Sequence, residues 1–226
     1  MAVAFDAFAT GDGTGASITV SITLGGTANL LIAFVMIDAP SNFNPSATWN
    51  GVSMGALVNE VFTGRYLAWF KLASPDTGTH DLVVSGLPGG GQERACGISF
   101  SGVDTTTPTD AAQSSSLSGA SDPVTLTNSS ATGDMVVGCA VNNGSSAPTV
   151  DGTNDDPAMT TPTGGSVAQA NMSSLVTYQA GQATVTTSWN NVAGSESAFA
   201  ININASGGGG GGGSPAFRMS LLGVGR

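Results

Sequence analysis

Charged side chains are scarce in this sequence, and positive ones are the scarcest. Lysine and arginine together number 5 and histidine 1, against 15 aspartates and glutamates, so the formal net charge is -10. A chain with this balance repels phosphate backbones and anionic lipid headgroups. We therefore expect no nucleic acid and no membrane surface among its partners.

Long apolar segments are also lacking. The longest, Leu30 to Ile37, is far shorter than the roughly 18 residues of a transmembrane helix and suits a strand that is buried on both faces. The segment Met1 to Asp6 has no basic residue and reaches an acidic one before any apolar run. We therefore expect neither a membrane span nor a secretory signal peptide.

Residues that could carry catalysis are few. His80 is the only histidine, so a Ser-His-Asp triad would depend on it. It lies in a strand-like pattern, where we expect it to face solvent, and the chain has no Gly-x-Ser-x-Gly motif to supply a nucleophile. The glycine-rich segment 86–92 lacks the Gly-Lys-Ser/Thr ending of a phosphate loop. We predict no catalytic residue and no cofactor, and a hydrolase with two facing carboxylates is a distant alternative.

Only two cysteines occur, Cys96 and Cys139, in separate strand-like segments. We expect buried free thiols that act as small apolar side chains, with a disulfide between them as the alternative. No cysteine or histidine cluster suggests zinc. The segment Asp151 to Asp156 has enough oxygen donors for calcium without the spacing of an EF-hand loop, so we interpret it as a solvated turn and predict no metal site.

What the sequence does contain is the composition of strands and turns. Glycine accounts for 33 of 226 residues, and serine, threonine and asparagine surround short runs of valine, isoleucine and leucine. Several segments alternate apolar and polar residues, and none shows sustained helical periodicity. We therefore predict an all-β fold, an antiparallel β-sandwich.

The order of these features repeats at an offset of about 105 residues. We predict an internal pseudo-two-fold repeat, with half-repeats at about 15–104 and 120–205 that each supply roughly five or six strands. One sandwich over residues 1–205 is preferred to two small sandwiches in tandem. The matching segments are 20–35 with 124–141, 48–51 with 149–152, 79–85 with 182–188, and 95–101 with 197–203.

The end of the chain differs from the rest. Residues 206–213 form a glycine linker that includes seven consecutive glycines, which cannot build a core. The last segment, 214–226, is apolar and mildly basic, and we interpret it as a docking peptide rather than a disordered remnant. Its apolar anchors for an assembly contact are Phe217, Met219, Leu221, Leu222 and Val224.

Aromatic residues are few enough that most should lie in the core. Trp69 and Phe70 are adjacent in a strand-like segment, so they point to opposite faces. If only one of them faces a core, the other is free for a contact. We name Trp69 as the candidate for a ligand or subunit contact.

Four segments taken in order resemble jelly-roll-like β-sandwich domains of tailed-phage virion structural proteins and bacterial surface proteins: 30–35, 48–51, 72–84 and 98–104. In such domains the position of His80 usually holds an aliphatic or aromatic residue, so the histidine is outside the resemblance, which brings no catalytic residue.

The resemblance implies a non-enzymatic virion protein, most simply a capsid decoration (cement) protein that contacts other virion proteins and further copies of itself. The alternative is a tail-fibre or surface adhesin module that binds host glycans. The expected location is the virion, or else the bacterial surface or extracellular space.

Overall fold

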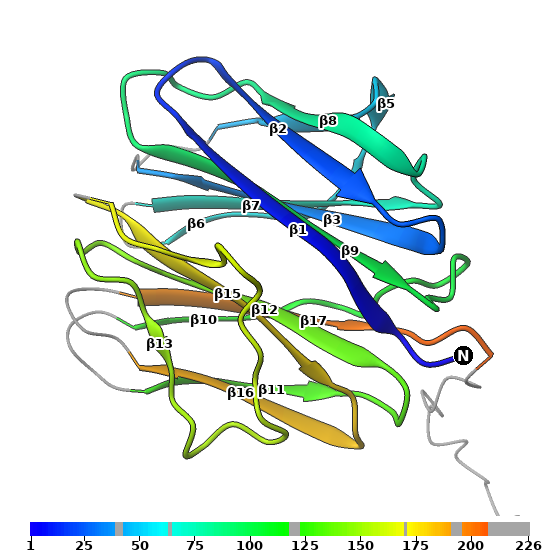
Figure 1. Ribbon diagram of the computed structural model, residues 1–226. Helices are drawn as coiled ribbons and strands as arrows, with labels where there is room; N and C mark the ends of the chain where they lie inside the picture. Colours follow the sequence, from blue (N-terminus) through cyan, green and yellow to red (C-terminus); the bar gives the residue numbers. More distant parts are fainter. Residues whose placement is uncertain (39–42, 63–64, 118–122, 170, 191–195, 208–226) are drawn as a thin grey trace, which may run out of the picture.

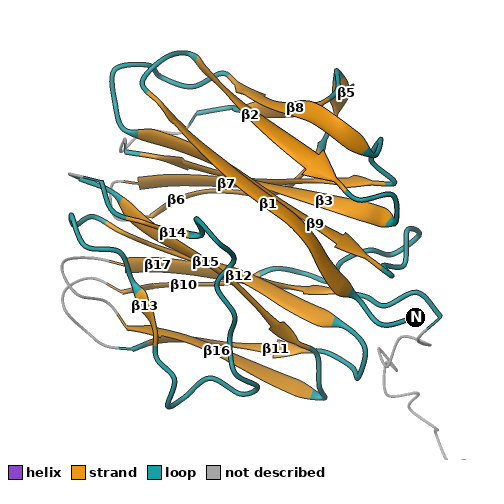
Figure 2. Cartoon of the chain, viewed as in Figure 1, coloured by secondary structure: helices purple, strands orange, loops and turns teal. Residues whose placement is uncertain are grey.

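The computed structural model describes residues 1–38, 43–62, 65–117, 123–169, 171–190 and 196–207. Every regular element in these ranges is a β-strand, and every strand pair is antiparallel (Figure 2). No helix in the described ranges is long and apolar enough to cross a membrane. The predicted all-β antiparallel fold is confirmed.

The first half of the chain forms two sheets. The inner sheet contains, in spatial order, β1 (Ala4–Gly13), β9 (Glu93–Ser101), β3 (Ala28–Ile37), β7 (Arg65–Ala73) and β6 (Gly55–Phe62). The outer sheet contains β2 (Ser17–Leu24), β8 (Gly78–Ser85), β4 (Ser46–Trp49) and β5 (Val52–Ser53).

The second half forms two sheets in the same way. Its inner sheet contains β10 (Gln113–Leu117), β17 (Glu196–Ile203), β12 (Met135–Asn142), β15 (Ser173–Ala180) and β14 (Ser166–Val167). Its outer sheet contains β11 (Val124–Ser129), β16 (Thr184–Asn190) and β13 (Thr149–Val150).

The predicted internal repeat is confirmed by strand order and by register. The five strands of the first inner sheet and their equivalents in the second inner sheet lie in the same spatial order. The outer sheets also match in order, except that β5 has no counterpart. In register, Phe34 of β3 lies opposite Cys96 of β9, and the equivalent Cys139 of β12 lies opposite Phe199 of β17. The offset read from the sequence therefore reflects two copies of one strand arrangement.

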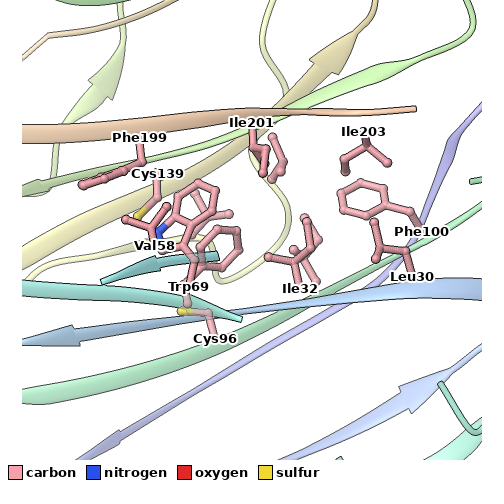
Figure 3. Packing of buried hydrophobic residues seen from close by; sticks show 14 of the residues in the cluster. Leu30, Ile32, Val58, Trp69, Cys96, Phe100, Cys139, Phe199, Ile201 and Ile203 are labelled. Atoms are coloured by element: carbon pink, nitrogen blue, oxygen red, sulfur yellow. The ribbon is translucent and has the colours of Figure 1, made fainter. Parts of the chain in front are cut away.

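The four sheets stack as layers, outer, inner, inner and outer, with an apolar core in each of the three spaces (Figure 1). The first-half core lies between β2, β8 and β4 on one side and the inner sheet on the other, and it includes Trp49. The second-half core is its counterpart and includes Trp189. The central core joins the two inner sheets and contains residues of both halves (Figure 3).

This stack differs from the preferred expectation of a single sandwich, and also from two sandwiches standing apart. Each half encloses a core of its own, and the two halves then share the third. The physical reason lies in β3 and β12, whose residues are buried along both faces, as at Leu30 to Ile37, where every residue has an exposed fraction of 0%. An inner sheet with two apolar faces needs a cover on each side.

The outer strands show the complementary pattern. Along β2, exposed and buried residues alternate strictly, with Ile18, Val20, Ile22 and Leu24 facing the first-half core. A strand with one apolar face packs on one side only. The stack therefore ends at the outer sheets.

Candidate functional site

A shallow pocket of about 480 Å³ opens on the outer sheet of the first half. Its lining comes from β2, from β8 and from the turn after β4, which meet because β8 pairs with both β2 and β4. The polar groups that it presents belong to Ser21, Asn50, Thr79, His80 and Asp81.

The turn after β4 fixes one wall of this pocket. Asn50 and Gly51 both have positive φ, 46° and 78°, as the Asn-Gly signal predicts for a tight hairpin turn between β4 and β5. The Asn50 Nδ2 atom donates to Oδ2 of Asp76 at 3.1 Å, and Nε1 of buried Trp49 donates to the Asp76 carbonyl oxygen at 2.9 Å. The turn is therefore held against the core beneath it.

His80 lies at the inner edge of the pocket rather than in open solvent. It pairs with Ile22 of β2, whose side chain faces the core, and its ring packs edge-on against Trp49 with 5.6 Å between centroids. The expectation of a solvent-facing histidine is wrong in this respect, because strand alternation places His80 on the same face of β8 as buried Leu82 and Val84.

The chemistry available at His80 is limited. Its Nε2 atom lies 3.2 Å from the Thr77 carbonyl oxygen, and no serine, threonine or cysteine side chain of the described residues is hydrogen-bonded to it. Asp81 follows on the other face of the strand, is exposed, and its carboxylate has no hydrogen bond or ion pair among the described residues. The arrangement can hydrogen-bond a polar ligand, but it does not align a base with a nucleophile.

Trp69 does not occupy the position that we predicted. Its exposed fraction is 0%, and it packs in the central core at 4.3 Å from the Phe34 ring and 5.9 Å from the Phe199 ring, measured between centroids. Phe70 faces the first-half core. The prediction that the two side chains point to opposite faces of the strand is confirmed. Both faces of this sheet pack against a core, however, so Trp69 is not available for a surface contact with a ligand or subunit.

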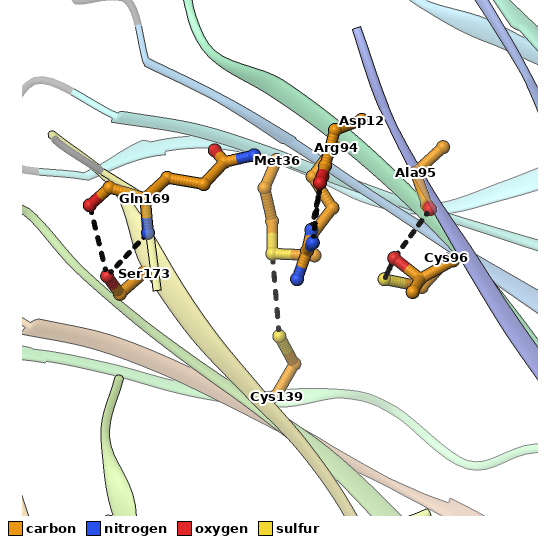
Figure 4. Close-up of polar contacts among 9 residues, drawn as sticks. Asp12, Met36, Arg94, Ala95, Cys96, Cys139, Gln169 and Ser173 are labelled. Atoms are coloured by element: carbon orange, nitrogen blue, oxygen red, sulfur yellow. Dashed lines mark hydrogen bonds and ion pairs between the residues drawn. The ribbon is translucent and has the colours of Figure 1, made fainter. Parts of the chain in front are cut away.

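The cysteines are free and buried, as expected. Both lie in the central core, where the Cys139 thiol is 4.0 Å from the Met36 sulfur and the Cys96 sulfur is 3.3 Å from the Thr10 hydroxyl (Figure 4). Burial raises the pKa of Cys96 to about 11 and raises that of Cys139 well above its ordinary value. Neither is a poised nucleophile.

Of the two remaining predicted sites, the structure describes the Asp151 segment but not the C-terminal anchors. The carboxylate of Asp151 accepts bonds from the backbone and side chain of Asn154 and from the Ser188 hydroxyl, and the Asn154 side chain is the main cause of its lowered pKa. This is a self-satisfied turn. The assembly anchors Phe217, Met219, Leu221, Leu222 and Val224 lie outside the described residues.

Sequence reasoning did not identify the pocket, although it did identify the Asn-Gly turn that forms one wall. Glu93, which sequence reasoning weighed only as one member of a possible hydrolase carboxylate pair, has an exposed fraction of 0%; its Oε1 accepts from Gly89 N at 2.9 Å while Oε2 has no partner. Within the described ranges no group of three or more histidine, cysteine, aspartate or glutamate side chains could hold a metal.

Comparison of the chain with protein-family models, curated proteins and solved structures found no significant match. The function is therefore argued from the residues and their geometry.

Proposed function

We propose that this chain is a non-enzymatic structural protein of a virion, a subunit that decorates or cements a phage capsid by binding its neighbours. The observation that carries the proposal is the meeting of the two ends of the described body. The Met1 ammonium group donates a hydrogen bond to the Ser206 carbonyl oxygen, and Ala205 forms an isolated antiparallel β-bridge with Val103. The glycine linker thus begins from an anchored point on a four-layer scaffold.

Charge supports a role for the segment beyond that point. All 15 acidic residues precede residue 207, together with only Arg65, Lys71 and Arg94, whereas Arg218 and Arg226 follow the glycines. A basic, apolar peptide that follows a run of glycines is suited to an acidic surface of a neighbouring copy. Each contact would be modest, because ordering the linker costs entropy, but repetition over a shell adds avidity.

Removing residues 207–226 tests this proposal. The shortened chain should keep its strands and thermal stability, since the three cores lie within the body, and it should lose binding to particles prepared without the protein. The matched control replaces Arg218 and Arg226 with glutamine in the full chain, which should weaken binding partially and increasingly with salt. Unchanged particle binding by the shortened chain would exclude the tail as the assembly contact. Electron microscopy of labelled particles distinguishes shell from tail location.

A second candidate is a tail-fibre or surface adhesin module that binds a glycan, and the pocket around Asn50 and Asp81 favours it. Shallow sites with carboxylate, amide and hydroxyl groups suit sugar hydroxyls. A glycan array, followed by NMR titration of any hit, tests it. Asp81→Asn should weaken the binding of a ligand that occupies the pocket. Asp12→Asn cannot serve as the control, because Asp12 forms an ion pair with Arg94. Asp156→Asn serves instead, since Asp156 is an exposed acid outside the pocket.

A further inference from the structure

We propose that the second half of this chain binds a divalent cation of the calcium type through Asp110, Asp134, Asn202 and Asn204. These residues meet where β17 ends, close to Ser206 and Met1. The Nδ2 atom of Asn202 is the common centre: it lies 3.1 Å from Asp110 Oδ2, 3.1 Å from Asp134 Oδ2 and 2.9 Å from Asn204 Oδ1. Three oxygens from three side chains therefore converge on one atom.

Among the described residues, no ammonium or guanidinium group is hydrogen-bonded to the carboxylates of this cluster: the nearby ammonium groups of Lys71 and Met1 donate instead to the Thr109 hydroxyl and the Ser206 carbonyl oxygen. The partners of Asp110 are the amides of Asn202 and Asn204. Those of Asp134 are the Asn202 amide and the backbone N–H groups of Ala131 and Ala205. Every one of these donors is neutral, so two carboxylates converge without a positive charge among their hydrogen-bonding partners, which is unfavourable at short range.

The hydrogen bonding of the Asn202 side chain is a second, independent observation. The residue has an exposed fraction of 1%, and its Oδ1 atom is buried without a hydrogen-bond partner. Its amide nitrogen carries two hydrogens but faces three acceptors. One acceptor is thus in excess at one end of the amide, while the other end has no partner. Buried amides are normally satisfied at both ends, so this one calls for an explanation.

The first half provides an internal comparison. By strand register, the positions of Asp110, Asp134 and Asn202 correspond to Asp6, Asn29 and Ser99. There the single carboxylate of Asp6 accepts from the Ser99 hydroxyl at 2.7 Å and from Gly25 N at 3.0 Å.

Asn29 replaces the second carboxylate in that half, and its two amide ends bond the backbone of Val103 at 2.8 and 3.1 Å. The first half is therefore satisfied by its own residues with one negative charge. The second half carries an additional carboxylate and further amide oxygens at the same place in the fold.

A hard divalent cation fits this donor set. Calcium takes six to eight oxygens from carboxylates, amide carbonyls and water. Asp110, Asp134 and Asn204 already present oxygens, and half a turn of the Asn202 amide would present Oδ1 in place of Nδ2. Water can complete the shell because Asp110 is exposed. With only two carboxylates we expect weak binding, with Kd of about 0.1–1 mM, as in extracellular calcium modules.

The inference does not depend on the proposed virion role. It concerns the place where the connector at Asp110, the loop before β12 and the end of β17 are tied together, directly before the glycine linker. Bound cation would stiffen that junction whatever the tail contacts.

Calcium alone is the probe, and the full chain is the sample. In about 10 mM CaCl₂, compared with EDTA and NaCl at the same ionic strength, the melting temperature should rise by about 3–6 °C for a Kd near 1 mM. In an NMR titration, the amide signals of Ala131, Asn204 and Ala205 should move and saturate together.

Asp110→Asn removes one charge at the exposed edge of the cluster and should weaken calcium binding at least tenfold. Asp81→Asn makes the same change of charge in the distant pocket and should leave it unaltered. The proposal is overturned if the parent chain shows no saturable response, or if both variants respond as the parent does, which would indicate only general screening of the net charge. The melting temperature of Asp110→Asn in EDTA shows independently that the variant is folded.

Discussion

The thiol of Cys139 lies 4.0 Å from the thioether sulfur of Met36, which belongs to the opposite inner sheet. In register, Cys139 pairs with Phe199, whereas the equivalent pair in the first half is Phe34 with Cys96. Large and small side chains are thus exchanged between the two copies of the repeat. This exchange lets the inner sheets interlock, because a pseudo-two-fold axis would otherwise bring like-sized side chains together.

Both cysteines should resist modification in the folded protein. Burial raises the pKa of the Cys96 and Cys139 thiols, so almost no thiolate forms at pH 8, and reagents have no access to either sulfur. Iodoacetamide followed by mass spectrometry should show no adduct on the native chain and two adducts in guanidinium chloride. Rapid labelling of one thiol in native buffer would contradict the tight junction between the two halves.

The two buried tryptophans Trp49 and Trp69 should respond differently to phenylalanine. Trp49 donates a hydrogen bond to the Asp76 carbonyl oxygen, whereas Nε1 of Trp69 has no partner. Trp49→Phe should therefore lower the free energy of unfolding by about 1 kcal/mol more than Trp69→Phe. Trp69→Ala should cost about 3–5 kcal/mol through the void in the central core. Denaturant titration measures all three, and equal costs for the two phenylalanine variants would refute the hydrogen-bond argument.

Gly97 should be required for contact between the sheets of the first half. A Cβ atom at this position would overlap Cδ1 of Ile22 and lie 3.2 Å from Cδ2 of Leu82. Gly97→Ala should destabilise the protein by about 1–3 kcal/mol. Ile22→Val removes the overlapping methyl group at a cost of about 0.5–1.5 kcal/mol. In a double-mutant cycle the combined variant should be more stable than the sum of the two changes predicts, and simple additivity would contradict the steric explanation.

Glu93 should make stability fall as the pH rises. Burial raises its pKa above that of the unfolded chain, so the folded state binds the proton more tightly. Its favourable contribution is therefore complete below the ordinary value of 4.5 and is lost as pH rises through the folded value. Glu93→Gln keeps an acceptor for Gly89 N and should stabilise the protein at pH 7 relative to the parent, with a smaller difference at pH 4.

Asp104 provides a control of opposite sign. Hydrogen bonds, the largest from Thr106 N and the next from Thr107 N, lower its pKa, so its contribution is present above the ordinary value and is lost as pH falls through the folded value. Asp104→Asn should lose stability at pH 7 and approach the parent in acid. Parallel pH profiles for the Glu93 and Asp104 variants would show that general charge, rather than these local causes, sets the dependence.

The sequence predicted one part of the candidate site, the tight turn that forms one wall of the pocket. Asn50 and Gly51 adopt the positive φ values that an Asn-Gly pair predicts. The neighbours of this turn in the pocket, Ser21 and Asp81, come from strands about 30 residues away on either side. Their meeting follows from β8 pairing between β2 and β4, which is a matter of long-range register that no local pattern encodes.

By itself the sequence determined the strands, their alternation and the repeat, because side-chain periodicity is a local property and the order of features survives in both halves. It also showed that Leu30 to Ile37 would be buried on both faces. Only the tertiary structure decided what covers those faces. An apolar face specifies that something must exclude water from it, but the hydrophobic effect has no direction and names no partner. The outer sheet of the first half covers one face. The second inner sheet covers the other, and in doing so it buries Trp69 and brings Cys139 to Met36.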